Sequence, residues 1–368
     1  MKAIQQLQEL GQSLWLDNIT RQMLRDGTLR RYVNEFSVTG LTSNPTIFDK
    51  AIKNGNAYDG AIRRKTAEGK SGETLFLDLA LEDLTQAADL FRPIYERTHG
   101  VDGWASLEVS PLLANDTTGT IAAARELHAR GQRPNLFIKI PGTPEGIPAI
   151  EASTLAGVPI NVTLLFSAEQ YVAAAEAYMR GIERRLAAGL DPHVHSVASL
   201  FVSRWDVAVK DVVPQKLRNR LGIAVAQRTY KAYRDLLGSP RWQVLAAAGA
   251  LPQRLLWAST GTKDPDASDT LYIEALAAPD TVTTIPDATL LAFADHGRVR
   301  DVMPVDGGDA ENTIADIRRT GVDVVALAIQ LQREGIESFD KSWQDLLARL
   351  AAKIAMLEQT AQPNTAQR

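Results

Sequence analysis

Residues 158–189 read VPINVTLLFSAEQYVAAAEAYMRGIERRLAAG, and they contain the pattern of one strand followed by one helix. The run VPINVTLL (158–165) combines apolar and β-branched residues, as is typical of a buried strand. Ser167, with Gln170 three positions later, is the signature of a helix N-terminus, and Gly189 ends the helical pattern. The stretch therefore predicts a β-α unit, from which parallel sheets are built.

The same alternation recurs along the whole chain. Eight runs fit the strand pattern: 13–18, 37–44, 104–110, 135–140, 158–165, 197–203, 254–260 and 281–286. Helical patterns separate them, and one of these, AAARELHARG, ends at Gly131. Eight such units favour a closed (β/α)8 TIM barrel over a doubly wound sheet. No GxGxxG follows the first strand, which also argues against a dinucleotide-binding fold.

Two spacers, 45–103 and 205–253, are long and contain helical sequence without strands or a Pro/Ser linker. We therefore expect additional helices after strands 2 and 6 of one barrel domain over residues 1–359, in place of separate domains. After strand 8, amphipathic patterns over 309–320, 322–334 and 338–359 predict C-terminal helices. The last segment, 360–368, lacks apolar content, and we expect it to be disordered.

The composition is that of an ordinary globular chain: 368 residues, 45% hydrophobic and 23% charged, with a net charge of −4. There is no dense Lys/Arg run, which argues against nucleic acid and anionic membrane as partners. The start, MKAIQQLQELGQSLWLDN, has no apolar targeting core, and no long apolar run occurs, so we expect a cytoplasmic protein. The absence of cysteine excludes disulfides and thiolate chemistry.

Lys139 stands inside the apolar strand of NLFIKIPGTPEG (135–146). Strand side chains alternate between faces, so this lysine shares a face with Phe137. Pro141 predicts the strand end, because proline cannot continue a central ladder. A lysine here either reaches water at the rim or is retained for its amine. Taken alone, the rim is the commoner place, since buried unpaired lysines are rare.

Other strands also carry small, aromatic or ionisable side chains near their carboxyl ends, where a plain core would have Val, Ile and Leu. We expect this inward-facing set to contact substrate: Asp17, Thr42, Asn44, Glu108, Asn161, Thr163, Ser199, Phe201 and Ser259. Structural alternatives exist: Asp17 could cap a helix over 20–33, and Glu108 could pair with an arginine. Asn44 could belong to a turn. In a barrel, however, these strand ends converge on the rim where active sites lie, so we favour the functional interpretation.

These residue types fit Schiff-base chemistry. A lysine amine in an apolar barrel loses solvation of its charged form, which lowers its pKa and allows the neutral amine to attack a carbonyl. The iminium then accepts electrons, so that a nearby C–C bond can break and leave an enamine. Asp17 and Glu108 suit the proton transfers, and Asn44, Asn161 and Thr163 can orient hydroxyls and water. The histidines lie in loop or helical contexts away from this rim, so we expect no metal and no cofactor.

A substrate phosphate would need a cation, and two follow the strands on this rim. Arg204 comes after strand 6, close to Ser199, and Lys263 ends the turn WASTGTK after strand 7. Loops at this place often hold phosphate in barrels. The structural alternative for Arg204 is a salt bridge to Asp206 or Glu183.

The motifs GLTSNPTIF, SLEVSP, FIKIPGTPEG, INVTLLFS and SLFVSR, in this order and spacing, resemble the transaldolases of the class I aldolase superfamily. The resemblance covers about residues 13–300. WASTGTK and the two long spacers are similar to the longer bacterial type, which also occurs fused to glucose-6-phosphate isomerase; we expect no such second domain in this chain.

The resemblance implies roles for the matching residues. Lys139 would form the Schiff base, and Asp17 would handle the proton of the C4 hydroxyl. Glu108 would act through a water held by Thr163. Asn44 and Asn161 would bind the dihydroxyacetone portion, and Ser199 and Arg204 the phosphate. Many members have a second arginine after strand 7, where this chain has Lys263. We expect Lys263 to take the place of that arginine, although lysine lacks the bidentate geometry of arginine.

The expected activity is transfer of a dihydroxyacetone unit from sedoheptulose 7-phosphate to glyceraldehyde 3-phosphate, in the pentose phosphate pathway. The products would be erythrose 4-phosphate and fructose 6-phosphate. Two alternatives stay open: an aldolase that releases free dihydroxyacetone, and a barrel that binds sugar phosphates without catalysis. The expected partners are small sugar phosphates. The amphipathic C-terminal helices could pack on the barrel or form a homodimer, and packing on the barrel is the simpler expectation.

Overall fold

The structure is a computed structural model that describes residues 3–361. Its centre is a closed barrel of parallel strands, in which each strand pairs with the next and β8 pairs with β1. The strands are β1 (Ser13–Leu16), β2 (Val38–Thr42), β3 (Trp104–Glu108), β4 (Leu136–Pro141), β5 (Ile160–Leu165), β6 (Ser196–Phe201), β7 (Gln253–Ala258) and β8 (Val282–Ile285). The predicted (β/α)8 barrel is confirmed, and the expected strands differ from the observed ones only near their ends.

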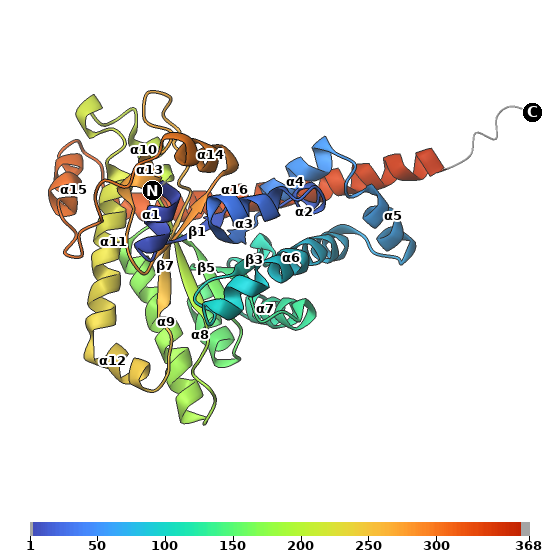
Figure 1. The fold of residues 1–368 in the computed structure, drawn as a ribbon, viewed down its shortest axis with the longest axis horizontal. Helices are drawn as coiled ribbons and strands as arrows, with labels where there is room; N and C mark the ends of the chain where they lie inside the picture. The colour runs from blue at the N-terminus through green and yellow to red at the C-terminus, as the bar shows by residue number, and fades with distance from the viewer. Residues whose placement is uncertain (1–2, 362–368) are drawn as a thin grey trace, which may run out of the picture.

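Helices surround the barrel, as Figure 1 shows. They are α1 (Ala3–Glu9), α2 (Arg21–Arg25), α3 (Thr28–Phe36), α4 (Pro45–Asn54), α5 (Asp59–Ala67), α6 (Gly72–Arg97), α7 (Thr117–Gly131), α8 (Gly146–Leu155), α9 (Ala168–Ala187), α10 (Ser203–Val209), α11 (Leu221–Gly238), α12 (Pro240–Ala247), α13 (Leu271–Ala275), α14 (Asp287–His296), α15 (Ala310–Arg318) and α16 (Val324–Ala361), with short 3-10 turns at Pro111–Leu113 and Gln215–Leu217. Extra helices follow β2 (α4 and α5 before α6) and β6 (α10 to α12), which confirms both expected insertions.

Large aromatic side chains fill the lower part of the barrel. Trp15 and Trp104 lie on either side of Gly40, with which both are in register. A Cβ on Gly40 would lie 2.7 Å from the Trp15 indole nitrogen and 2.8 Å from the Trp104 carbonyl oxygen, so the Trp15 indole fits only because this strand position has no side chain. Phe137 stacks on Trp104 with ring centroids 3.9 Å apart. This packed floor leaves the polar residues at the carboxyl ends of the strands as the upper layer.

Helix α16 is one continuous helix, and the predicted break between 334 and 338 is wrong. Gly335 lies in this gap in the sequence pattern, yet it is buried against the barrel, where a Cβ would meet Leu164. Tertiary packing therefore stabilises a position that weakens an isolated helix. Figure 1 shows α16 running from the barrel outward beside α4, α5 and the start of α6. There Trp343 packs on Phe76 at 5.0 Å between ring centroids.

The segment expected to be disordered, 360–368, lies mostly outside the described residues. Positions 360 and 361 form the end of α16, and residues 362–368 are not described.

Candidate active site

A cavity of about 120 Å³ lies at the carboxyl ends of the strands, inside the mouth of the barrel. It brings together most of the residues predicted from the sequence. The predicted residues that line it are Asp17, Thr42, Asn44, Lys139, Thr163, Ser199, Phe201, Arg204 and Ser259, and the lining also includes Leu256, Ala258, Thr284 and Phe339. Glu108, Asn161 and Lys263 are not part of the lining.

Lys139 points into this cavity from the middle of β4 and is only 6% exposed. Its Nζ lies 3.6 Å from Oε2 of Glu108, which is 7% exposed. The two residues are register partners on neighbouring strands, so the backbone itself fixes their approach. Glu108 thus lies directly behind the amine. At 3.6 Å the pair is held by charge rather than by a normal hydrogen bond, which leaves both groups able to bind other partners.

Asp17 lies just after β1 and accepts a hydrogen bond from Thr42 Oγ1 at 3.0 Å. It does not cap a helix: the N-cap of α2 is Thr20. Burial raises the pKa of Asp17, and the Lys139 charge opposes that shift. Burial likewise raises the pKa of Glu108 against the same opposing charge. Two carboxyls with raised pKa values near one buried lysine hold protons more readily than free carboxyls do, which suits them to take up and return protons.

Behind the lining, Asn161 forms a hydrogen-bonded support. Its Nδ2 donates to Ser106 Oγ at 3.1 Å, and its Oδ1 accepts from Ser199 Oγ at 2.7 Å. By contrast, the Thr163 hydroxyl and Glu108 Oε2 are buried but make no hydrogen bond to other described residues. The Thr163 hydroxyl is therefore free to bind a water or a substrate hydroxyl, and Glu108 Oε2, whose Lys139 partner lies 3.6 Å away, can accept a hydrogen bond from one.

Asn44 has two roles that do not compete. Its Oδ1 accepts from the Ile47 backbone N–H at 3.1 Å and caps α4, which begins at Pro45. The structural role of Asn44 is thus a helix cap in place of the considered turn, and the side-chain amide still lines the cavity, where it can donate to substrate.

Arg204 has no carboxylate within ion-pair distance among residues 3–361. The salt bridges considered as alternatives do not form: Asp206 accepts from two backbone N–H groups of α11 and from a tyrosine hydroxyl, and Glu183 pairs with Arg241. The guanidinium instead lies 5.0 Å from the ring centroid of Phe201. A partly buried cation that is stacked on a ring and acted on only by the more distant charge of Glu334 suits an anionic ligand.

The region after β7 agrees less well with the prediction. Ser259 lines the cavity, and its hydroxyl lies 2.9 Å from that of Ser203. Lys263 is exposed and lines a neighbouring pocket of about 200 Å³, together with Asp206 and Arg218. The charge of Lys263 still lowers the pKa of Asp17 slightly, so Lys263 is near enough to the cavity to act on Asp17. A phosphate-binding role for Lys263 stays a prediction.

The sequence reasoning missed Thr284 and Phe339. Thr284 is the inward residue near the end of β8, and strict alternation in TVTTIP could have identified it. Phe339 belongs to α16, far along the chain from the strands, and its ring lies 5.7 Å from Lys139 Nζ. No local pattern separates it from the other apolar residues of this helix.

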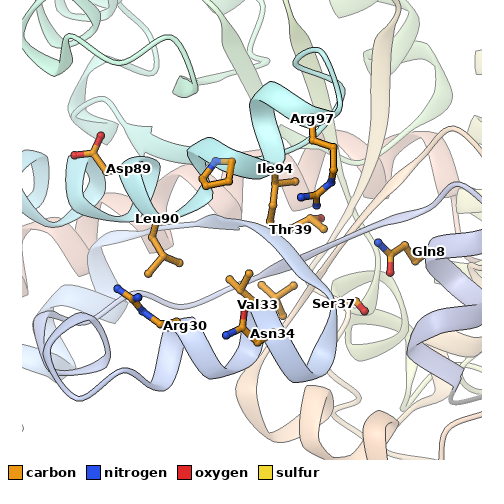
Figure 2. Close-up of a pocket in the computed structure, with 12 residues that line it drawn as sticks. Gln8, Arg30, Val33, Asn34, Ser37, Thr39, Asp89, Leu90, Ile94 and Arg97 are labelled. Carbon is orange, nitrogen blue, oxygen red and sulfur yellow. The ribbon is translucent and has the colours of Figure 1, made fainter.

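A larger cavity lies elsewhere. It measures about 600 Å³ and lies between α3 and α6 near the start of β2, as Figure 2 shows. Its polar side chains, such as Arg30, Asn34 and Arg97, are exposed, and it contains none of the candidate residues. Size alone therefore does not single out the candidate site, which is distinguished by the buried Lys139 and the two carboxyls beside it.

The His, Asp and Glu side chains of residues 3–361 form no group of three or more that could hold a metal ion. Within the same residues, every helix is too short or too polar to cross a membrane.

Comparison with known proteins gives a consistent result. A family model described as transaldolase/fructose-6-phosphate aldolase matches residues 14–350. The chain is 46% identical over 363 residues to a transaldolase of Thermobifida fusca, covering 96% of this chain and 98% of that protein. It is 43% identical to a transaldolase of Thiobacillus denitrificans, over 95% of this chain and 100% of the relative. A third transaldolase, from a Parafrankia species, is 45% identical over 94% and 96% of the two chains.

Proposed function

The chain belongs to the transaldolase/fructose-6-phosphate aldolase family, and from that premise we propose that it is a transaldolase whose Schiff base forms on Lys139. It transfers a dihydroxyacetone unit from sedoheptulose 7-phosphate to glyceraldehyde 3-phosphate, giving erythrose 4-phosphate and fructose 6-phosphate in the pentose phosphate pathway. One observation carries the assignment of the lysine: its buried Nζ faces the cavity 3.6 Å from Glu108.

Imine formation needs a proton acceptor and a proton donor near the amine. The neutral Lys139 amine adds to the C2 carbonyl of the donor sugar, and the carbinolamine then loses water to give the iminium. Glu108 would carry protons to and from this oxygen through a water held by Thr163. The support for this role is that Glu108 Oε2 and the Thr163 hydroxyl are both buried without a hydrogen bond to other described residues.

Cleavage needs a base on the other side of the substrate. Asp17 would take the proton of the C4 hydroxyl; the C3–C4 bond then breaks, its electrons move into the iminium, and the aldose leaves. The enamine left on Lys139 attacks the carbonyl of the acceptor, and Asp17 returns its proton to the new hydroxyl. Thr42 orients Asp17 through its 3.0 Å hydrogen bond. Asn44 and Asn161 would hold the dihydroxyacetone portion.

Both substrates carry a phosphate, and Arg204 would bind it. Of the residues that line the cavity, Lys139 and Arg204 are the cations, and Lys139 is committed to the carbonyl. Ser199 was expected to share the phosphate, but its hydroxyl donates to Asn161, so Arg204 carries this part of the proposal. Ser259 and Phe201 complete the wall beside it.

The test is reduction of the imine. The protein is mixed with fructose 6-phosphate and borohydride, and its intact mass and peptides are measured. We expect a gain of one reduced dihydroxyacetone unit on Lys139, none in Lys139→Met, and the normal gain in Lys216→Met, which removes an exposed lysine. A folded wild-type protein that gives no adduct, or a Lys139→Met variant that still turns over, would refute the assignment.

The family description also covers fructose-6-phosphate aldolases, so the aldolase alternative has a specific basis. It predicts free dihydroxyacetone from fructose 6-phosphate when no acceptor is present, at a rate comparable to transfer. A purely binding protein would bind sugar phosphates without the adduct; the contact of Lys139 with Glu108 argues against it.

We further propose a cytoplasmic location, where sugar phosphates are metabolised, and a single domain over residues 1–359. Small sugar phosphates are the expected partners. A homodimer is the assembly to test, and light scattering of the purified protein would measure it.

A further inference from the structure

We infer that Phe339 of α16 determines the fate of the dihydroxyacetone unit held on Lys139, because its ring covers the amine and favours transfer to an aldehyde over release by water. This inference rests on the proposed function. The ring centroid lies 5.7 Å from Lys139 Nζ and 5.8 Å from the Arg204 guanidinium carbon. It lies 6.5 Å from the Phe201 ring. Phe339 thus contacts the region between the reacting amine and the proposed phosphate site.

Phe339 differs in origin from the rest of the lining. The other lining residues come from the strands and from the loops or helices directly after them, whereas Phe339 is contributed by the C-terminal helix. Its ring is half-buried and packs against the same apolar cluster that fills the barrel interior. The barrel supplies the reacting groups, and α16 supplies an apolar cover for them.

Two contacts hold α16 close to the barrel mouth. Gln332 Nε2 donates to the carbonyl oxygen of Gly142 at 3.0 Å and to that of Leu164 at 2.9 Å. One turn later is Gly335, where a Cβ would lie 2.9 Å from Leu164 Cδ2 and 3.3 Å from Arg204 Nη1. Positions 332, 335 and 339 share one face of a helix, so these contacts direct the Phe339 ring into the cavity.

The covered intermediate has two possible fates. In transfer, its nucleophilic carbon attacks the aldehyde, a C–C bond forms, and the new alkoxide takes a proton. In release, the same carbon takes a proton from an acid or a water in the cavity, and the resulting iminium adds one water to give dihydroxyacetone and the free amine. A phenyl ring has no proton to give and occupies space that water would fill. The ring therefore disfavours release without hindering transfer chemistry.

The experiment compares two truncations on the same helix. Phe339→Ala removes the cover, and Ile336→Ala removes a partly buried side chain that packs on the same cluster but does not line the cavity. Release is measured as free dihydroxyacetone from fructose 6-phosphate alone. Transfer is measured with sedoheptulose 7-phosphate and glyceraldehyde 3-phosphate. Phe339→Leu, which keeps more of the apolar volume, serves if the alanine variant folds poorly.

We expect the ratio of release to transfer to rise about tenfold in Phe339→Ala and less in Phe339→Leu, because water reaches the intermediate. Ile336→Ala should lower the melting temperature and leave the ratio unchanged. An unchanged ratio in both Phe339 variants, with the borohydride adduct still present on Lys139, would overturn the inference and leave the proposed function intact. If the wild-type protein forms no adduct, the proposed function fails and this inference fails with it.

Discussion

Replacing Arg204 by glutamine removes the guanidinium from the cavity and keeps a shorter polar side chain beside Phe201. Among the described residues, no carboxylate forms an ion pair with Arg204, so the substitution leaves no carboxylate unpaired. Any large effect should therefore come from the loss of an interaction with substrate. Because the proposed interaction is with phosphate, the effect should depend on whether the substrate carries one.

The size of the effect follows from the bond that is lost. A hydrogen bond to a charged partner contributes about 1.5–3 kcal/mol, which corresponds to a factor of about 10 to 160 in binding. The guanidinium is already partly desolvated beside Phe201, at 5.0 Å from the ring centroid, so little further desolvation offsets the gain on binding phosphate. We expect kcat/KM for glyceraldehyde 3-phosphate to fall within that range in Arg204→Gln.

The assay compares two acceptors, glyceraldehyde 3-phosphate and unphosphorylated glyceraldehyde. In a ping-pong mechanism kcat/KM for the acceptor reports only the second half-reaction, so altered donor binding does not enter. Arg204→Gln should reduce the ratio of the two values strongly, and Lys263→Gln, which changes an exposed lysine outside the cavity, should reduce it about threefold at most. Equal losses for both acceptors in Arg204→Gln would refute the assignment of Arg204, whereas a loss in Lys263→Gln as large as that in Arg204→Gln would support the predicted phosphate-binding role of Lys263.

Three further changes test the site and its floor. Gly335→Ala places a Cβ 3.3 Å from Arg204 Nη1, so KM for the phosphorylated acceptor should rise severalfold despite a helix-propensity gain of about 1 kcal/mol; an unchanged KM would contradict the close approach. Asp17→Asn should abolish turnover and yet raise the free energy of unfolding at pH 7. Burial raises the pKa of Asp17, so the ionised group destabilises the folded chain, and in urea unfolding the gain should shrink as the pH falls toward the ordinary value of 3.8; a gain independent of pH would contradict this cause. Gly40→Ala forces a Cβ to within 2.7 Å of the Trp15 indole and should cost about 1–3 kcal/mol in urea unfolding, whereas a neutral change would show that the floor can relax.

Strand periodicity made the barrel and much of the rim predictable. Side chains alternate between the two faces of a strand, so the position of Lys139 within its strand determines that it faces inward. The same holds for Thr42 and Thr163. Closure of the barrel then brings residues that are more than a hundred positions apart in sequence to one mouth. Asp17 and Ser199, for example, line the same cavity from β1 and β6.

The rest of the site depends on information that local patterns do not contain. Lys263 lies in an irregular turn, where no period fixes the direction of a side chain, and it faces a neighbouring pocket. Phe339 is one apolar residue among many on α16, and only the packing of that helix across the barrel mouth directs it toward Lys139. In the sequence Gly335 indicates a break in the helix, whereas in the structure it lies within α16 so close to the barrel that a Cβ would be 2.9 Å from Leu164 Cδ2.

The charges in the cavity bear on how one site can do both proton transfers. Lys139, Glu108 and Asp17 lie close together with one positive charge and two carboxyls, and burial raises the pKa of each carboxyl. The charge of Lys139 opposes this rise for both carboxyls, and each carboxyl still retains its proton more readily than an isolated acid does. Loss of water from the carbinolamine needs such a proton, and cleavage needs a carboxylate without one. The 3.6 Å contact holds Glu108 at the amine, whereas Asp17, just after β1, is held by the Thr42 hydroxyl. One cavity can therefore hold an acid and a base at once.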